Sequence, residues 1–347
     1  MNEKLEKKKK KISLKDFKIF VIMISTFYTI AIVLYLALDA FFYLVNFMII
    51  GTSIGLGMGL WPVFSKKNKH KARKLCQALV GGYLFFGIGC GLMYTLFGYI
   101  LPENMQFEGF WFWLFAGSFA AAVLHYFIAK IFGPFLFNRG WCGWACWTAA
   151  ILDYLPWKKS SGRIKKFGVL RYIHFTFILL ISIILVFFLS YTLHTIEGII
   201  ALPGVEFTTT INQYNFLFEI PEFWWFLIGN ILYFSSGIVL ATVLKDNRAF
   251  CKYLCPITVF LKIGGKFALM KIEGDPDKCT DCKACTRACP MDIDVHEYVK
   301  NGMRVTSSEC ILCMNCINVC PENNLKVTTK LDKKYNKFLR YKDEKIT

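Results

Sequence analysis

Eight cysteines near the C-terminus form two runs of identical spacing. Residues 279–290 read CTDCKACTRACP and residues 310–321 read CILCMNCINVCP, so each run is C-x2-C-x2-C-x3-C-P. With this spacing bacterial ferredoxins hold two [4Fe–4S] clusters, and the fourth cysteine of each run ligates the cluster of the other run. C-x2-C pairs also bind zinc, but the doubled pattern with both trailing prolines favours two [4Fe–4S] clusters.

The crossing of the fourth cysteine divides the eight ligands into two sets. The cluster I cysteines are expected to be Cys279, Cys282, Cys285 and Cys320. The cluster II cysteines are expected to be Cys310, Cys313, Cys316 and Cys289. These residues are ligands, and the sequence indicates no catalytic acid, base or nucleophile beside them.

A second pair of cysteine motifs lies upstream of the ferredoxin runs. Residues 138–146 read NRGWCGWAC and residues 247–255 read NRAFCKYLC, a shared pattern of N-R-x-aromatic-C-x-aromatic-x-C. Thiols spaced C-x3-C on a helix lie on one face with Cβ atoms about 5–6 Å apart, which is too far for an unstrained disulfide. The repeat indicates that four cysteines act together, and we name them the four-cysteine site: Cys142, Cys146, Cys251 and Cys255.

Three interpretations of the four-cysteine site are open. Four facing thiolates suit a shared metal or iron–sulfur site, two pairs of thiols suit redox chemistry, and the motifs could also be structural. In the first case Arg139 and Arg248 would offset part of the negative charge of the thiolates.

The remaining chain has the composition of a membrane protein. Of its 347 residues, 55% are hydrophobic and 17% aromatic, well above a soluble domain. The net charge of +17 leaves three long stretches without any Lys or Arg: residues 19–65, 75–129 and 172–244. Basic residues between apolar segments follow the positive-inside rule, which argues against nucleic-acid binding. The fourteen cysteines then indicate metal ligation in a reducing cytoplasm rather than disulfides.

Six membrane-spanning helices fit the apolar segments at about 20 residues per crossing. They are expected over residues 17–38, 41–61, 75–100, 110–130, 170–193 and 224–244. The connections 101–109 and 195–223 carry acidic residues without a cation and are expected outside. The fold class is therefore an α-helical polytopic membrane protein of about six transmembrane helices, with both termini and both clusters in the cytoplasm.

A C-terminal α+β ferredoxin domain completes this fold. The segments Leu269–Gly274 and Leu325–Thr329 are expected to be strands that pair with each other. The predicted divisions are a basic cytoplasmic N-terminus, a membrane domain, the 2[4Fe–4S] ferredoxin domain and a charged tail, at residues 1–16, 17–262, 266–330 and 331–347. We expect the tail to be a surface arm near lipid headgroups.

Two histidines are secondary candidates. His125 and His174 are expected at a similar depth near the cytoplasmic face, where they would suit a bis-histidine haem or a quinone headgroup. One histidine on each helix is more often a satisfied interfacial residue. Cys76 and Cys90 have no spaced partner and are expected to be buried apolar residues.

Membrane helices, two C-x3-C motifs and a double cluster segment resemble the NapH/NosR/CcoG group of membrane-bound polyferredoxins. The resemblance covers residues 138–321. It implies a cytoplasmic ferredoxin domain and electron transfer between the quinone pool or cytoplasmic donors and respiratory or maturation partners. Trp147 stands where the group often has proline, the six expected helices exceed the four of the NapH type, and no S/T-G-A-[ST] flavin-attachment signature occurs.

The sequence therefore predicts a membrane-anchored iron–sulfur electron-transfer protein in the plasma membrane. It would relay electrons between a cytoplasmic donor and a quinone or partner redox protein, as a component rather than a stand-alone enzyme. One alternative is a membrane copper reductase that uses the C-x3-C thiols, since soft thiolates bind Cu(I). The other is a redox-sensing or assembly subunit.

Overall fold

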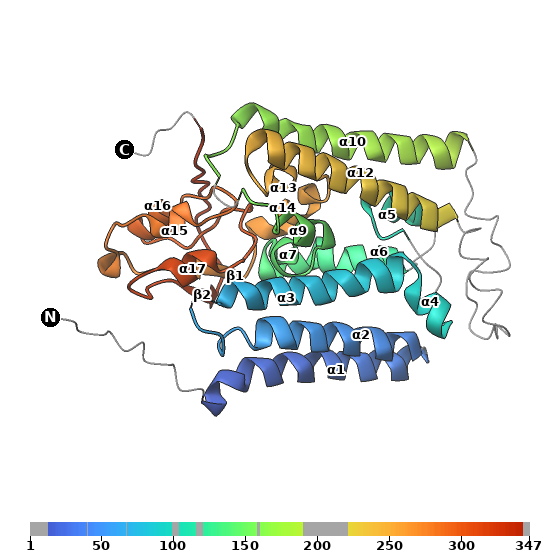
Figure 1. Cartoon of the computed structure of the whole chain (residues 1–347), viewed down its shortest axis with the longest axis horizontal. Coiled ribbons are helices and arrows are strands. Elements are labelled where there is room, and N and C mark those ends of the chain that lie inside the picture. The colour runs from blue at the N-terminus through green and yellow to red at the C-terminus, as the bar shows by residue number, and fades with distance from the viewer. Residues whose placement is uncertain are drawn as a thin grey trace.

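The computed structural model describes residues 13–39, 41–66, 68–98, 104–115, 121–157, 160–189 and 221–342. The expectations for residues 1–12 and for most of the acidic connection 195–223 lie outside the described residues. Long helices make up most of the described chain, and a small cysteine-rich domain packs against one end of them (Figure 1).

The membrane domain consists of helices of very different length. The first half contains α1 (Lys18–Leu38), α2 (Phe41–Ile54), α3 (Lys69–Gly82), α4 (Leu92–Phe97), α5 (Phe107–Phe115), α6 (Ala121–His125) and α7 (Gly133–Phe137). The second half contains α8 (Gly140–Trp144), α9 (Trp147–Leu152), α10 (Leu170–Ile183), α12 (Pro221–Leu244), α13 (Ala249–Tyr253) and α14 (Thr258–Lys266). Segments of π-helix extend α2, α3, α6 and α10, namely Gly55–Gly59, Tyr83–Gly89, Tyr126–Phe132 and Ile184–Phe188.

Four helical segments are long and apolar enough to cross a membrane. They are Leu14–Ala37, Phe41–Gly59, Lys165–Phe188 and Phe223–Leu244, and each corresponds to one of the six expected spans. The expected span 75–100 is interrupted at Gly91, whose φ of 70° ends the helix before α4 begins. The expected span 110–130 falls on α5 and on the shorter apolar segment Val123–Phe137. The chain is a membrane protein, and the structure shows four of its spans as long continuous helices.

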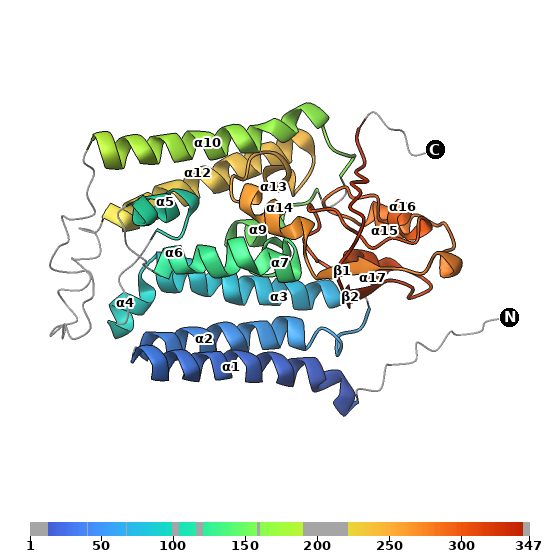
Figure 2. The same cartoon turned by 180° about the vertical axis from the view of Figure 1, so that it is seen from behind.

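Glycines let α1 and α2 pack closely. A Cβ atom added at Gly59 would lie 2.6 Å from the Cα of Phe20, and one at Gly55 would lie 2.7 Å from the side chain of Ile24. Small residues at every fourth position are the usual way in which helices approach one another in lipid. The two helices lie side by side along one edge of the molecule in both views (Figures 1 and 2).

The ferredoxin domain has little regular structure apart from short helices and one pair of strands. It contains β1 (Met270–Glu273), α15 (Ala284–Arg287), α16 (Val295–Lys300), α17 (Asn315–Val319) and β2 (Lys326–Thr329). Strand β1 pairs with β2 in antiparallel register, Met270 opposite Thr329. The predicted strand pairing is therefore confirmed. Figure 2 shows the domain beside α13 and α14, at the same end of the helices.

The charged tail corrects one expectation. Leu339 and Arg340 are only 7% and 9% exposed. Arg340 donates its backbone N–H to the carbonyl of Asp292 at 2.8 Å, and Arg163 donates to the carbonyl of Arg340 at 2.9 Å. This part of the tail therefore packs between the ferredoxin domain and the membrane domain, and the prediction of a surface arm is wrong there.

Candidate iron–sulfur sites

The four cluster II cysteines line a single cavity. Cys289, Cys310, Cys313 and Cys316 surround it, and the rest of its wall is mostly apolar: Ile272, Pro290, Met291, Ile293, Val295, Val305, Ile311, Leu312 and Met314. Cys310, Cys313 and Cys316 are 8–9% exposed. The structure thus brings the fourth cysteine of the first run, Cys289, to the first three cysteines of the second.

The four cluster I cysteines line a second cavity nearer the surface. Cys279, Cys282, Cys285 and Cys320 surround it, with Thr280, Lys283, His296, Pro321 and Glu322 in its wall. Cys282 is exposed, whereas every cluster II cysteine is buried or half-buried. Short α15 and α17, each packed against the other, carry the third cysteine of each run.

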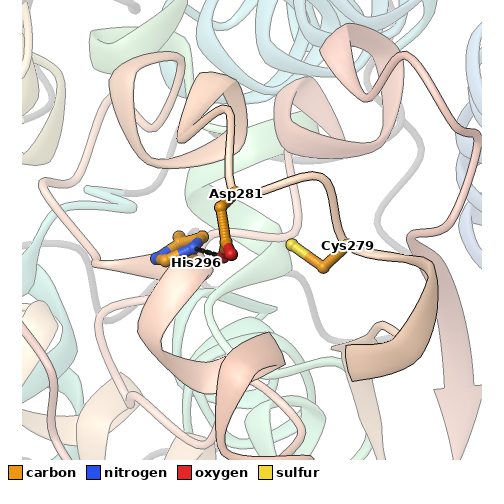
Figure 3. A group of neighbouring side chains, drawn as sticks. All are labelled: Cys279, Asp281 and His296. Atoms are coloured by element: carbon orange, nitrogen blue, oxygen red, sulfur yellow. Dashed lines mark hydrogen bonds and ion pairs between the residues drawn. The ribbon is translucent and has the colours of Figure 1, made fainter.

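One group beside cluster I also has the ligand atoms of a metal site. Cys279, Asp281 and His296 place one ligand atom each within 4.8 Å of one another (Figure 3). His296 Nε2 lies 2.6 Å from Asp281 Oδ1, and this hydrogen bond lowers the pKa of Asp281. Because Cys279 belongs to the cluster I set, the histidine and the aspartate are neighbours of that cluster rather than a separate centre.

The donor chemistry of both cavities fits iron–sulfur clusters. Each cavity offers four soft sulfur donors, which are the ligands that [4Fe–4S] clusters use. Burial raises the pKa of Cys310 to about 12 and of Cys285 to about 11. Thiols with such pKa values become thiolates when a metal compensates their charge, so the buried cysteines suit metal binding better than free-thiol chemistry.

The C-x3-C motifs adopt the same local structure in both copies. In the first, the N–H groups of Ala145 and Cys146 both donate to the carbonyl of Trp141. In the second, the N–H groups of Leu254 and Cys255 both donate to the carbonyl of Phe250. In each copy the first cysteine lies on a five-residue helix, α8 or α13, and the second cysteine follows the end of that helix, where the chain turns towards a new helix. The sequence repeat is therefore a structural repeat.

The two arginines of the repeat cross between the copies. Arg139 of the first copy donates through Nη2 to the carbonyl of Cys251 at 3.3 Å. Arg248 of the second copy donates through Nη1 to the carbonyl of Cys142 at 3.1 Å. Both arginines are at most 1% exposed. This reciprocal pair holds the two motifs face to face.

The four thiols are close enough to influence one another electrostatically. Burial, and after it the neighbouring Cys142, raises the pKa of Cys146. Burial raises the pKa of Cys251 to about 11, where Arg248 opposes and Cys142 and Cys146 add to the shift. Cys142 and Cys251 are each 5% exposed. The structure therefore brings the four cysteines of the repeat into one buried site.

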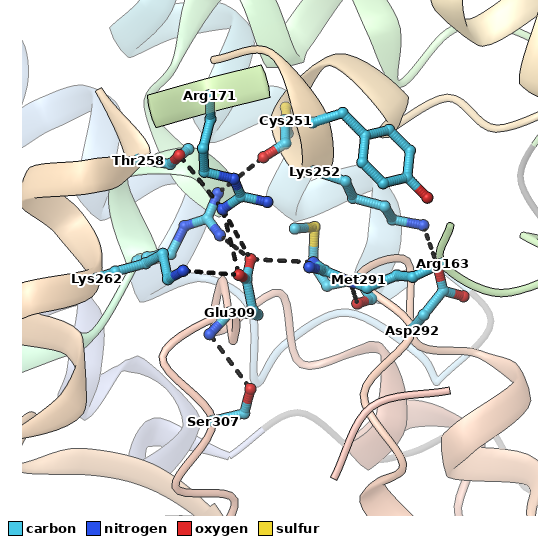
Figure 4. Close-up of polar contacts among 12 residues, drawn as sticks. Arg163, Arg171, Cys251, Lys252, Thr258, Lys262, Met291, Asp292, Ser307 and Glu309 are labelled. Carbon is cyan, nitrogen blue, oxygen red and sulfur yellow. Dashed lines mark hydrogen bonds and ion pairs between the residues drawn. The ribbon is translucent and has the colours of Figure 1, made fainter. Parts of the chain in front are cut away.

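The ferredoxin domain is fixed to both motifs beside cluster II. Arg139 pairs with Glu309, the residue before Cys310, at 2.5 Å. Lys252, the residue after Cys251, pairs with Asp292 and with Asp246. Glu309 also forms ion pairs with Arg163, Arg171 and Lys262, at 3.0, 3.2 and 3.5 Å (Figure 4).

Sequence reasoning misses these anchoring residues. Glu309 and Asp292 are 1% and 0% exposed, and their partners lie more than a hundred residues away or on another helix. In the sequence Lys130 only marks the end of a helix, yet its ammonium lies 4.1 Å from the ring centroid of Trp141 and interacts with Cys142, Cys146 and Cys255. The only signal is the position of Glu309 beside a cysteine ligand.

The two candidate histidines and the two isolated cysteines each have different neighbours. His174 Nδ1 lies 2.8 Å from the carbonyl of Leu254, and the ring of His125 contacts Trp141 edge-on. Cys76 is fully buried, as expected, and Cys90 is half-buried.

Known protein families match both the ferredoxin cysteines and the two C-x3-C motifs. A 4Fe-4S dicluster domain matches residues 271–321. A 4Fe-4S binding domain matches twice, over residues 119–166 and 227–273, and each match contains one C-x3-C motif. No solved structure matches the chain.

Several proteins are similar to this chain in sequence. An uncharacterized protein of Methanocaldococcus jannaschii is 25% identical over 57% of the chain and 68% of its own length. The ferredoxin-type protein NapH of Haemophilus influenzae is 26% identical over 59% of the chain and 67% of its own length. The regulatory protein NosR of Pseudomonas aeruginosa is 26% identical over 73% of the chain, but the match covers 34% of that longer protein.

The matched domains contain twelve of the fourteen cysteines, and four long apolar helices make up much of the remaining chain. The protein is therefore an iron–sulfur electron-transfer protein with two [4Fe–4S] clusters, and it is similar to the NapH- and NosR-type ferredoxin proteins.

Proposed function

We propose that this protein relays electrons between a soluble cytoplasmic donor and an acceptor at the membrane, a quinone or a partner redox protein. The electrons would pass from the cluster I cysteines to the cluster II cysteines and then to the four-cysteine site. An iron–sulfur cluster supplies one-electron chemistry when bound, and the protein supplies burial, charge compensation and a fixed path between the sites.

The observation that carries this proposal is the contact of the first C-x3-C motif with the cluster II set. The backbone N–H of Arg139 donates to the carbonyl of Cys310 at 3.2 Å. Trp144 Nε1 donates to the carbonyl of Leu312 at 2.8 Å. The core that contains Cys310, Cys313 and Cys316 also contains Cys142. Cluster II is therefore the ferredoxin site that borders the four-cysteine site.

The exposure of the cysteines supports the same order. Cys282 of cluster I is exposed, the cluster II cysteines are mostly buried, and Cys142 and Cys251 are 5% exposed. A soluble donor can approach cluster I, while two thiols of the four-cysteine site are buried and the other two, Cys146 and Cys255, are half-buried. This burial also favours a relay over a copper reductase, because a copper substrate would need access to these thiols.

The charges around the four-cysteine site support an iron–sulfur cluster there. Lys130, Arg139 and Arg248 are at most 1% exposed, and Arg73 is 6% exposed. The neighbouring carboxylates Asp153 and Glu309 do not balance them, because Glu309 already accepts from three further cations. Buried cations without compensation are costly. Four thiolates around an iron–sulfur core carry a net negative charge that would compensate them.

The spacing of the four thiols also supports an iron–sulfur cluster at the four-cysteine site. A zinc ion with Zn–S bonds of about 2.3 Å would draw its four sulfurs to within about 4 Å of one another. Among the described residues, the one group of three ligand atoms within 4.8 Å of one another is that of Cys279. The four cysteines of the repeat do not form a group of this compactness, which supports a cluster of several metal atoms over a single zinc ion.

The distribution of charge supports the cytoplasmic orientation. The basic segments lie between the apolar spans on the side that leads into the ferredoxin domain, as the positive-inside rule requires for cytoplasmic loops. The donor would then be a cytoplasmic protein or cofactor, and lipid would surround the spans.

Electron delivery from the purified protein in lipid nanodiscs tests the relay. A reduced low-potential ferredoxin serves as donor, a membrane-soluble quinone serves as acceptor, and absorbance of the clusters is followed by stopped flow. We expect the double variant C142S/C251S to keep its ferredoxin clusters and accept electrons, but to pass none to the quinone above the background rate. The matched control C90S should behave like the wild type. Wild-type delivery by the double variant would refute the relay through the four-cysteine site.

A further inference from the structure

A chain of hydrogen bonds leads from the four-cysteine site into the helices. Trp147, which follows Cys146, donates through Nε1 to Asn230 Oδ1 at 2.8 Å. With the amide of Gln106 turned so that its nitrogen faces the carboxylate, its oxygen lies 2.9 Å from Asn230 Nδ2 and its nitrogen donates to Glu108 Oε1 at 2.5 Å. The second motif has Pro256 in place of Trp147, so only the first copy is linked in this way.

The chain of hydrogen bonds ends at the carboxylate of Glu108, which lies against Gly229 of α12. A Cβ atom at Gly229 of α12 would overlap the side-chain amide of Gln106 and the carboxylate of Glu108. Glycine is therefore required where these two side chains lie against the helix. Gln106 and Asn230 are 1% exposed, whereas Glu108 is half-buried.

Two buried tyrosine hydroxyls are near enough to interact with both Glu108 and the cysteines. Tyr126 and Tyr233 are 0% and 8% exposed, and neither hydroxyl has a hydrogen-bond partner among the described residues. Both tyrosines interact electrostatically with Glu108 and with Cys255. Buried polar groups of this kind are normally satisfied by ordered water, and such water would connect the carboxylate to the redox site.

The charges around Glu108 leave it without a counterion. The titratable groups described on the elements packed around α5 are Tyr233 on α12, the three residues Arg171, Tyr172 and His174 on α10, and His125, Tyr126 and Lys130 on α6 and its π-helical extension. Arg171 is paired with Glu309, and Tyr172 accepts a hydrogen bond from Lys262. Lys130 interacts with the cysteines, and His174 is bonded to the carbonyl of Leu254. Glu108 has no ion pair with any described residue. A carboxylate among membrane helices without a cation readily exchanges its charge for a proton.

We propose that Glu108 is a proton-exchanging site coupled to the four-cysteine site. When one electron arrives from the cluster II set, one proton from water adds to the Glu108 carboxylate and forms an O–H bond. When the electron leaves for the acceptor, the O–H bond breaks and the proton returns to water. The total charge of this buried region then stays constant during electron transfer. This inference rests on the relay proposed above.

Infrared difference spectroscopy of the full-length protein tests the proton site. Reduction of the wild type should produce a protonated-carboxyl C=O band that shifts in D2O, and E108Q should lack it. The variant Glu322→Gln, which removes a carboxylate in the wall of cluster I, should keep the band. A wild-type spectrum without the band overturns the proton site, and this readout does not depend on the folding of any variant.

A potentiometric titration followed by electron paramagnetic resonance separates the two proposals. In the wild type the potential of the four-cysteine site should fall by about 59 mV for each tenfold decrease in proton concentration, as one proton per electron requires. In E108Q it should be nearly independent of pH, with unchanged iron content. A third centre with a pH-independent potential in the wild type overturns the proton site and leaves the relay intact. Absence of a third centre in the wild type overturns both.

Discussion

The backbone N–H of Arg139 donates to the carbonyl oxygen of Cys310 across 3.2 Å. Through this bond a motif of the membrane domain contacts a ligand of the ferredoxin domain directly. The guanidinium of the same arginine reaches Glu309 and the carbonyl of Cys251. One residue of the first motif therefore contacts the second motif through its side chain and cluster II through its backbone.

Replacing Arg139 by lysine tests this bridge. Lysine keeps the charge but cannot form the forked contacts of a guanidinium. We expect the free energy of unfolding to fall by about 1.5–3 kcal/mol, because a hydrogen bond to a charged group is lost. We also expect slower electron delivery to a quinone. Differential scanning fluorimetry and the nanodisc assay measure the two effects.

The matched control is Arg287→Lys, because Arg287 donates to the carbonyl of Cys282 at 2.7 Å on the exposed side of cluster I. It should leave delivery unchanged. Equal effects of the two substitutions would show that the Arg139 bridge has no special part in transfer.

Gly143 provides a steric test of the same contact. A Cβ atom there would overlap the carbonyl oxygen of Ile311, whereas a Cβ atom added at Gly168 would meet no other atom within 4 Å. Overpacking at a tight contact costs about 1–3 kcal/mol. Gly143→Ala should therefore loosen the ferredoxin domain, seen as faster limited proteolysis between the domains, and Gly168→Ala should not. Identical digestion of both variants and the wild type would contradict the docked arrangement.

The ion pairs of Asp153 predict how the stability of the folded protein depends on pH. Burial alone would raise its pKa, but Arg248 and Arg73 lower the pKa of Asp153 below its usual value. Because the folded-state pKa is lower than the unfolded value of about 3.9, its stabilisation is complete above that pH and is lost as the pH falls through the folded value.

Asp153→Asn should accordingly lower stability by about 3 kcal/mol, because two buried arginines lose their carboxylate. The difference in unfolding temperature from the wild type should be constant from about pH 8 to pH 5 and shrink only below about pH 4. A difference that already disappears near neutral pH would mean that the carboxylate is not held by the arginines.

The exposure of the cysteines predicts unequal sensitivity to oxidants. Cys282 is exposed and Cys313 is 9% exposed, so a hydrophilic oxidant should destroy cluster I first. Ferricyanide with an iron chelator should release iron in two phases. In Cys320→Ala the fast phase should be lost, although Cys320 belongs to the second run. Loss of the slow phase instead would contradict the crossed assignment.

Local patterns in the sequence predict the features that depend on neighbouring residues. The cysteine spacing predicts the two ligand sets that line the two cavities, and the short apolar segments beside the cysteine runs predict the strands β1 and β2. The nine-residue repeat is also a local pattern, because it can be recognised within each copy. It indicates that Cys142 and Cys251 act together.

Features that depend on distant contacts could not be predicted. Glu309 is an ordinary acidic residue in the sequence, and its role depends on cations from four distant segments. The sequence predicts an outer loop around Glu108, because acidic residues without cations usually mark such loops. The structure starts α5 at Phe107 and turns Glu108 towards Gly229. In the sequence Trp147 is only a departure from a family pattern, whereas in the structure its indole is bonded to Asn230.

The iron and acid-labile sulfide content of the anaerobically purified full-length protein tests the relay most directly. Two [4Fe–4S] clusters account for about eight irons per chain. We predict a content clearly above that level in the wild type and a return to about eight irons in C142S/C251S, with the ferredoxin signals retained. A wild-type content of about eight irons, unchanged in the double variant, would contradict a cluster at the four-cysteine site.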